Sequence, residues 1–270
     1  MKKMFYFSAL GLLTVIFGAC ILSAWITPYD PVAPDLDSLK QAPSLSHPMG
    51  TDDRGRDVLS RVISGGKISI SLGIFTTALA LLIGVIFGFI SGYYGGWVDS
   101  FVGFFVNITL AFPSLLLAIA LSSVMEPGYM SIFITLVAVG WAGFAKLIRG
   151  ETLKLKNSPH VQAARVLGAS DLYILIRHIM PLCAGIIITA VTLRVGVAIL
   201  MESSLSFLGL GIQPPYPTWG GMVSQGRDFF RSAPWMTMFP GLIITVTILS
   251  LNIAGEGYKE IARKQQKTGN

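Results

Sequence analysis

Long apolar segments separated by short polar stretches constrain the fold of this chain more than any other feature. A helix needs roughly 20 consecutive apolar residues to cross the hydrocarbon core of a bilayer. Only 13% of the residues are charged, whereas an average globular domain has about 25%. The sequence therefore predicts an all-α membrane protein with six transmembrane helices. The expected spans are residues 4–26, 68–92, 100–124, 129–148, 182–210 and 235–255.

The first apolar segment, residues 4–26, follows Lys2 and Lys3 and contains no charged residue. It is longer than the roughly 7 to 15 apolar residues that form the core of a signal peptide. We therefore expect an uncleaved first span. A removed signal peptide is the alternative, because Leu22-Ser23-Ala24 weakly resembles a cleavage site.

Three features interrupt the apolar pattern inside the expected spans. Phe112-Pro113 lies in the middle of the third span, where the missing N–H of proline should kink or break the helix. Arg194 and Glu202 lie in the fifth. A charge in mid-membrane costs roughly 2.5 to 3.5 kcal/mol, so both should face the bundle interior, a subunit interface or a water-filled path. The residues leave open whether they make a structural contact, line a pathway or touch a substrate.

A polar loop, residues 28–67, contains a dense cluster of charges of both signs. We expect these side chains to neutralise one another in a compact turn. The apolar residues that follow should lie against the membrane surface. The charged residues are Asp52, Asp53, Arg54, Arg56, Asp57 and Arg61, and the apolar ones are Val58, Leu59, Val62 and Ile63.

A second polar segment, residues 157–181, separates the fourth and fifth spans. Ser158 followed by Pro159 is typical of a helix start. Gly168 should end this short helix, because glycine readily adopts the left-handed conformation that allows a sharp turn. Ser170 should cap the next helix. The pattern predicts a short helix, a glycine turn and a second helix that leads into the membrane.

Both polar segments, and a third one, resemble parts of a known family. Val161-Gln162-Ala163-Ala164, Gly168 and Ile179-Met180-Pro181 resemble the EAA loop of ABC importer permeases. Residues 50–61 resemble the GTDxxGRDxxSR signature of the second permease subunit in dipeptide, oligopeptide and nickel importers. Residues 202–220 resemble its E-x-S-L-S-F-L-G-L-G segment and the QPPxPxWG that follows.

The resemblance implies a type I ABC importer permease with a cytoplasmic coupling helix between the fourth and fifth spans. In this family that helix docks into a groove on a cytoplasmic ATPase. Gln162 replaces the usual Glu and removes a charge from the docking helix. The implied coupling residues are Val161, Gln162, Ala163, Ala164, Gly168, Asp171, Arg177 and Pro181. The signature residues are Gly50, Thr51, Asp52, Gly55, Arg56, Asp57, Ser60 and Arg61.

The same resemblance implies the partners and the substrate class. A homologous second permease, one or two ABC ATPases, an extracytoplasmic binding protein and membrane lipid are the expected partners. The chain should bind no cofactor or metal and should not be an enzyme by itself, because ATP and Mg would be bound by the ATPases. Short peptides are the first expected substrate, and nickel or a nickel chelate is the second.

Positive charge predicts the orientation of the chain. With both termini in the cytoplasm, twelve Lys and Arg residues lie inside and seven outside, and five of the seven belong to the long first loop. This distribution favours cytoplasmic termini, and the resemblance to ABC importer permeases implies a multi-pass protein of the bacterial inner membrane. The expected divisions are 1–67 for the first helix and external loop, 68–258 for the permease domain and 259–270 for a cytoplasmic basic tail.

Several other functions lack support in the sequence. Gly66-Lys67 is followed by Ile68, so no phosphate-binding P-loop is present. The three histidines have no zinc-type spacing and no carboxylate ligand beside them in sequence. Cys20 and Cys183 lie far apart in apolar segments and predict no disulfide framework. No basic stripe predicts nucleic acid. A transporter driven by an ion gradient and a non-transporting scaffold remain the alternatives.

Overall fold

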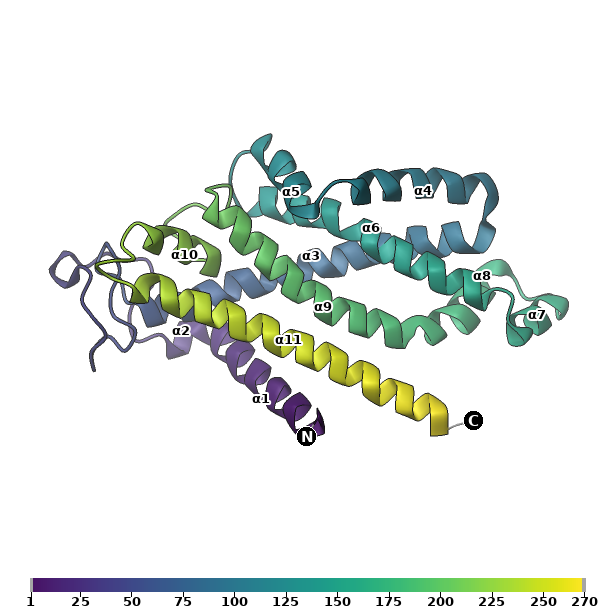
Figure 1. Ribbon diagram of the computed structural model, residues 1–270, viewed down its shortest axis with the longest axis horizontal. Helices are drawn as coiled ribbons and strands as arrows, with labels where there is room; N and C mark the ends of the chain where they lie inside the picture. The colour runs from purple at the N-terminus through teal and green to yellow at the C-terminus, as the bar shows by residue number, and fades with distance from the viewer. Residues whose placement is uncertain (1, 269–270) are drawn as a thin grey trace.

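The computed structural model describes the backbone of residues 2–268 and the side chains of residues 5–260. Its helices lie side by side along one long axis (Figure 1), with residues 28–57 and α10 at one end and α7 at the other. We refer to these as the α10 end and the α7 end. The helices are α1 (Lys2–Ile21), α2 (Ser23–Ile26), α3 (Val58–Tyr94), α4 (Gly96–Ala111), α5 (Ser114–Ser123), α6 (Tyr129–Leu155), α7 (Pro159–Val166), α8 (Asp171–Tyr173), α9 (Met180–Phe207), α10 (Trp219–Arg227) and α11 (Trp235–Thr268).

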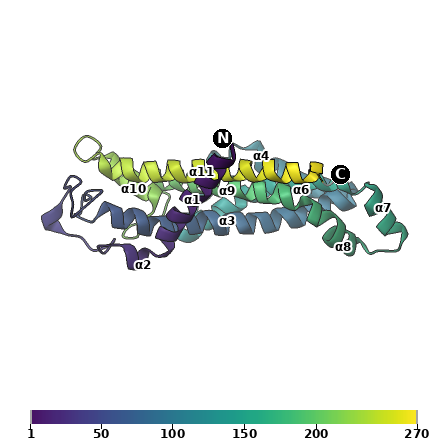
Figure 2. The same ribbon diagram turned by 90° about the horizontal axis from the view of Figure 1, so that it is seen from below.

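The apolar helices account for four of the six expected spans, or for five when the bent pair of α4 and α5 is counted as one span. Within the described residues, four segments are long and apolar enough to cross a membrane: 58–94, 129–155, 171–207 and 235–260. The pair α4 and α5 forms a fifth segment with a bend of 91°. The apolar part of α1, Phe5–Ile21, is shorter and lies obliquely across the other helices (Figure 2).

The bend between α4 and α5 confirms the break predicted at Phe112-Pro113. Phe112 is extended, with φ −89° and ψ 141°, and ends α4. Steric contact with the proline ring drives the preceding residue out of the helical region. The two halves of the third span therefore point in different directions.

Two helices extend beyond the expected bounds. Helix α3 begins at Val58 and crosses position 67 without interruption, because Asp57 caps it by accepting the N–H of Ser60 at 2.7 Å. Helix α11 continues to Thr268, so most of the expected basic tail is helical. Residues 269–270 of that tail, and residue 1, lie outside the described residues.

Helices α3 and α6 form the central pair of the bundle. Glycines at every fourth position of α3 face α6: Gly84, Gly88 and Gly92. A Cβ on Gly88 would lie 2.8 Å from the carbonyl oxygen of Ala145, and one on Gly92 would lie 2.8 Å from the Cβ of Thr152. Small residues at such a contact let helix backbones approach closely, which is a common packing mode in membranes.

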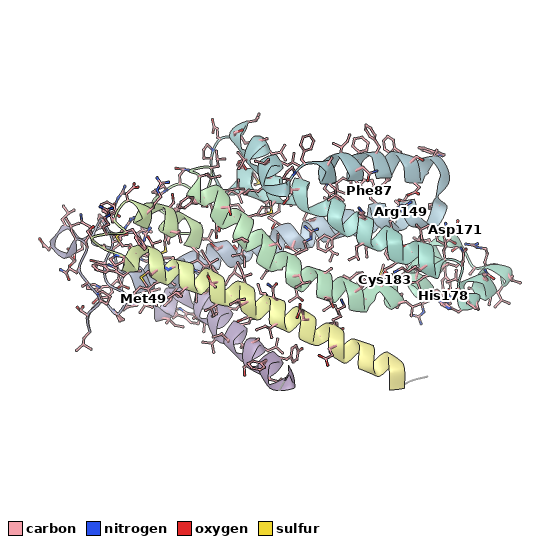
Figure 3. The ribbon with its side chains drawn as sticks, in the orientation of Figure 1. Met49, Phe87, Arg149, Asp171, His178 and Cys183 are labelled. Atoms are coloured by element: carbon pink, nitrogen blue, oxygen red, sulfur yellow. The ribbon has the colours of Figure 1, made fainter. Side chains whose placement is uncertain are left out.

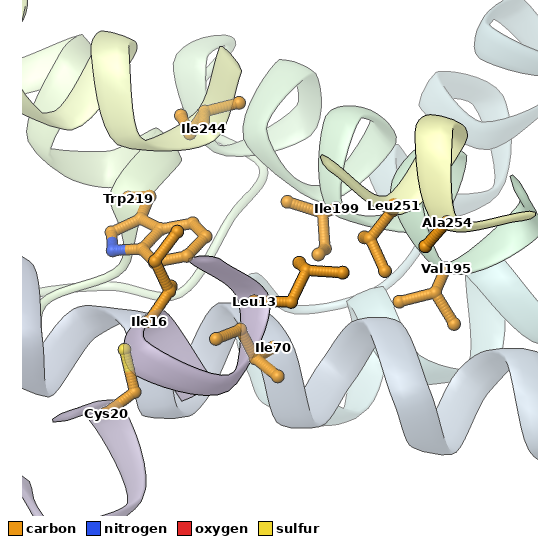
Figure 4. Close-up of a cluster of buried hydrophobic side chains, with 10 residues drawn as sticks. All are labelled: Leu13, Ile16, Cys20, Ile70, Val195, Ile199, Trp219, Ile244, Leu251 and Ala254. Atoms are coloured by element: carbon orange, nitrogen blue, oxygen red, sulfur yellow. The ribbon is translucent and has the colours of Figure 1, made fainter. Parts of the chain in front are cut away.

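The largest apolar cluster among the described residues joins α1, α3, α9 and α11 and extends from the α10 end to the middle of the bundle (Figure 4). Trp219, the first residue of α10, is fully buried among these helices. Its indole N–H donates to the backbone oxygen of Val62 at 2.8 Å. Cys20 packs in the same cluster, and Cys183 is buried near the α7 end, which agrees with the apolar role expected of both thiols.

Candidate functional site

Helix α7 stands beyond the ends of the long helices, with Ser158 and Pro159 at its start as predicted. The Ser158 hydroxyl does not cap the helix; it donates backwards to the carbonyl oxygen of Leu155 at 2.5 Å. At the other end, Gly168 has φ +82° and donates to the carbonyl oxygen of Arg165 at 3.0 Å. Ala169 donates to Ala164 at 3.0 Å, which completes a Schellman turn. The predicted left-handed glycine is confirmed.

The two faces of α7 have different environments. Val161 is fully buried and Ala164 nearly so, and both pack on the apolar residues of the next helical segment. Gln162 and Ala163 are exposed. Val166 and Leu167, at the end of this helix, are the most exposed apolar side chains of the segment, each 87% exposed. The sequence motif did not mark these two residues, although two apolar side chains just before a turn glycine are a readable signal.

Tyr93, near the end of α3, ties the α7 segment to the bundle. Its hydroxyl donates to the Oδ1 of Asp171 at 2.7 Å and accepts from the Nη2 of Arg165 at 3.2 Å. The Arg165 guanidinium also lies 5.6 Å from the centre of the Tyr93 ring. Asp171 was an expected coupling residue, whereas Tyr93 was not.

The segment after Asp171 leads into the membrane through a wide helical turn. Ser170 caps it, as predicted, by accepting the N–H of Tyr173 at 3.4 Å. Ile174–Ile179 are π-helical and precede α9, whose second residue is Pro181. Since Pro181 has no N–H to donate to the carbonyl of Arg177, regular α-helical bonding is interrupted at this point.

An ion pair also stabilises the α7 end. Arg149 of α6 makes two bonds to Asp99 of α4, at 2.5 and 2.6 Å, and the hydroxyl of Ser91 on α3 donates to the same carboxylate at 2.6 Å. Lys146 and Asn107 join them around a cavity of about 510 Å³. In Figure 3, Arg149 and Asp171 lie toward the same end of the bundle, and Met49 lies at the opposite end.

The signature residues gather into a buried turn at the α10 end. Asp52 accepts a hydrogen bond from the side chain of Arg56 at 2.8 Å and forms an ion pair with Arg61 at 3.3 Å, so the expected mutual neutralisation is found. Gly50 and Gly55 have φ of +73° and +75°, and both support tight backbone contacts. Thr51 pairs with Asp57 in an isolated β-bridge, and Ser60 donates its hydroxyl to Asp57 at 2.7 Å.

One expectation about this turn is wrong. Val58 and Val62 do not lie against the membrane surface; they are buried against Met222 because α3 begins at Val58 and packs under α10. The fold also brings His47 beside a carboxylate, with its Nδ1 3.0 Å from the Oδ1 of Asp57. The ten-residue separation of this pair hid it from sequence inspection.

The two charged residues of α9 face different neighbours. Glu202 is fully buried and accepts from the hydroxyls of Ser206 at 2.8 Å and Ser69 at 3.2 Å. The backbone N–H of Trp219 donates to the Ser69 oxygen at 3.1 Å, so this carboxylate links α9, α3 and α10. Arg194 instead lies over the ring of Phe144 on α6, 5.8 Å from its centre.

Within the described residues, no group of three His, Cys, Asp or Glu side chains is placed to hold a metal ion. The protein combines three features: apolar spans, a short helix held outside them at one end and a buried turn at the other. These features define an integral membrane protein with a short helix held outside its spans.

Comparison with known proteins gives the family. The sequence profile of the binding-protein-dependent transport system inner membrane component matches residues 84–264, and the chain belongs to this family. It is 41% identical over 241 residues to the glutathione transport system permease protein GsiD of Escherichia coli O1:K1 / APEC, covering 89% of this chain and 80% of the relative. The GsiD of Shigella dysenteriae serotype 1 (strain Sd197) is 40% identical over the same coverage. The chain is thus a multi-pass inner-membrane protein of the peptide and oligopeptide permease type.

Solved structures share the fold at low sequence identity. A chain of the inward-facing MetNI methionine ABC transporter aligns with a TM-score of 0.61 and 15% identity, covering 74% of this chain and 95% of that chain. A chain of an amino acid ABC transporter with histidines aligns with a TM-score of 0.55 and 15% identity, covering 77% of this chain and 94% of that chain. The architecture is therefore that of a type I ABC importer permease.

Proposed function

We propose that this chain forms half of the membrane pathway of an ATP-driven importer for short peptides and couples that pathway to cytoplasmic ATPases through α7. The observation that carries the proposal is the exposed apolar tip of α7, Val166 and Leu167, on a helix held by buried Val161 and by the Tyr93 contacts. A helix that is held in position and exposes apolar side chains at its end can bind in a groove on a partner protein. The α7 end is then cytoplasmic, and both termini lie on that side.

The remaining partners follow from the family. A homologous second permease supplies the other half of the pathway, and one or two ABC ATPases bind ATP and Mg. An extracytoplasmic binding protein delivers substrate at the α10 end. ATP binding closes the ATPases, and the contacts of α7 must differ between the closed and open states for the pathway to respond. The chain itself performs no catalysis.

The substrate assignment to short peptides is supported by the relatives named as glutathione permeases. Glutathione is itself a tripeptide, so it is the first compound to test, with tri-alanine as a second. Nickel uptake, measured in parallel, separates the peptide assignment from a metal importer built on the same permease type.

The first experiment is affinity purification of the tagged chain from its own membranes in a mild detergent, followed by mass spectrometry. Recovery of a second permease and of P-loop ATPases is the expected result. Recovery of the chain alone, in a detergent that preserves other complexes, would contradict the coupling role. The purified complex, placed in liposomes with its binding protein, should then accumulate labelled glutathione or tri-alanine only when ATP is supplied.

A further inference from the structure

Arg194 lies at the middle of α9, far from both ends of the bundle. Its side chain reaches across to α6, where the guanidinium lies 5.8 Å from the centre of the Phe144 ring. It also lies so close to Gly143 that a side chain at that position would collide with it. Because Gly143 has no side chain, the guanidinium has room at this position.

This cation lacks a partner of opposite charge. In the part of the chain that the structure describes, no carboxylate and no hydrogen-bond acceptor contacts Arg194. The other charge on α9, Glu202, is occupied by serine hydroxyls on a different side of the helix. An aromatic ring compensates an intramembrane charge only in part, so the site is set up to receive an anion.

A small cavity of about 30 Å³ lies beside the guanidinium, between α3, α6 and α9. A water-sized group needs roughly 10 to 15 Å³ of such volume, so the cavity has room for about two oxygen-sized groups. Thr76 and Thr77 line it from α3. Thr76 donates to the Leu72 carbonyl oxygen at 2.6 Å, whereas the Thr77 hydroxyl makes no hydrogen bond to any described residue. The cavity thus offers one cation and one free hydroxyl donor.

The chemistry of this pair suits a carboxylate. A planar guanidinium presents two parallel N–H groups to the two oxygens of a carboxylate. A phosphate, with its four oxygens, is too large for the space. A lipid headgroup is also excluded, because headgroups lie roughly 15 Å from the bilayer midplane.

We propose that Arg194, together with Thr77, binds a carboxylate of the transported molecule as it crosses the membrane. This inference rests on the proposed function and names the group by which the pathway itself recognises its substrate. It makes the permease selective for peptides with a free carboxylate, separately from selection by the binding protein. An acidic residue of the second permease is the competing occupant.

The test uses the complete importer in liposomes. Its substrate is whichever peptide the wild type accumulates, glutathione or tri-alanine. Uptake of that peptide is compared with uptake of its amide form, in which every carboxylate is converted to an amide. The binding protein is the same in each complex. Its preference for the acid or the amide therefore cancels when uptake by the variant is divided by uptake by the wild type. Arg194→Gln should lower uptake of the free acid by about tenfold or more, since it removes a charged hydrogen-bond pair, and should leave uptake of the amide unchanged.

Two further variants test the geometry. Arg194→Lys keeps the charge but loses the planar fork, so acid uptake should fall less than in Arg194→Gln. Thr77→Val removes only the hydroxyl and should lower acid uptake by about twofold to tenfold. Arg227→Gln is the matched control, because Arg227 also lies over an aromatic ring, that of Phe207, but at the α10 end. It should change acid and amide uptake by the same factor.

Equal losses for acid and amide in Arg194→Gln would overturn the inference and point to a contact with the second permease. No loss for either would also overturn it. In both cases the wild-type importer still takes up the peptide, so the proposed function would stand. Absence of ATP-dependent uptake of both peptides by the wild type is a different outcome, and it would overturn the proposed function together with this inference.

Discussion

The hydroxyl of Tyr93 donates to the carboxylate of Asp171 at 2.7 Å, across 78 positions of sequence. The same oxygen accepts from Arg165, so one phenol at the end of α3 holds both the short helix α7 and the helix that follows it. These bonds fix the position of α7 relative to the central helix pair. The proposed coupling depends on that position.

Tyr93→Phe should therefore weaken coupling while leaving the fold intact. It removes two hydrogen bonds to charged groups but keeps the buried ring, so ATP-driven uptake should fall by about threefold to tenfold. ATP hydrolysis by the complex should continue. Tyr94→Phe is the control, because the exposed Tyr94 makes no hydrogen bond to any described residue. A normal ratio of uptake to hydrolysis in Tyr93→Phe would contradict the anchoring role.

Gly168→Ala tests the turn that ends α7. No atom lies within 4 Å of the position that a Cβ would occupy, so only the φ of +82° opposes the substitution. A left-handed alanine costs roughly 1 to 2 kcal/mol. We expect normal membrane insertion and reduced coupling, measured as uptake per ATP hydrolysed. Gly150→Ala also enters open space but lies within helix α6 at a negative φ, and it should have no effect.

Ser69→Ala tests the buried link between Glu202 and α10. The Ser69 hydroxyl donates to Glu202 and accepts the N–H of Trp219, and its loss leaves a buried donor unsatisfied. The expected loss of stability is about 1 to 3 kcal/mol. Thermal unfolding in detergent, followed by fluorescence-detected size exclusion, should show a lower midpoint. Ser71→Ala is the comparison, since Ser71 bonds only to a carbonyl of its own helix. Equal midpoints in the two variants would rule out the link as a stabilising contact.

Gly88→Leu tests the close approach of α3 and α6. The new side chain would meet the backbone of Ala145 and the Cβ of Ile148, each 2.8 Å from the added Cβ, so the central pair must separate. Overpacking of this kind costs typically about 1 to 3 kcal/mol or more. The amount of monodisperse protein after extraction should drop. Gly103→Leu, on the open face of α4, should extract like the wild type, and equal yields for the two variants would argue against close packing at Gly88.

The sequence predicts the helical class, the six apolar segments and the local turns well, because these follow from nearby residues. Pro113 breaks its helix and Gly168 adopts a positive φ for reasons contained in a few positions. Helix α10 lies between the fifth and sixth expected spans, and its three glycines and polar residues mask a helix that tertiary packing of Trp219 stabilises. Long-range pairs such as Asp99 with Arg149 leave no local signal.

The candidate site shows the same division. The motif residues of α7 were predicted, yet the residue that anchors them, Tyr93, lies 68 positions before Val161 and outside the motif. Charges at Arg194 and Glu202 were recognised as unusual. Their opposite environments depend on which helices pack around α9, and a single sequence does not contain that information.

Helix α3 connects the two ends of the protein as one uninterrupted helix. It begins at the buried signature turn, capped by Asp57, and ends at the tyrosine that holds α7. A 37-residue helix is about 55 Å long. A tilt of about 10° around its midpoint moves each end by about 5 Å in opposite directions. We therefore expect α3 to act as a lever: a displacement imposed on α7 should reappear, in the opposite direction, at the α10 end, where we propose that substrate is delivered.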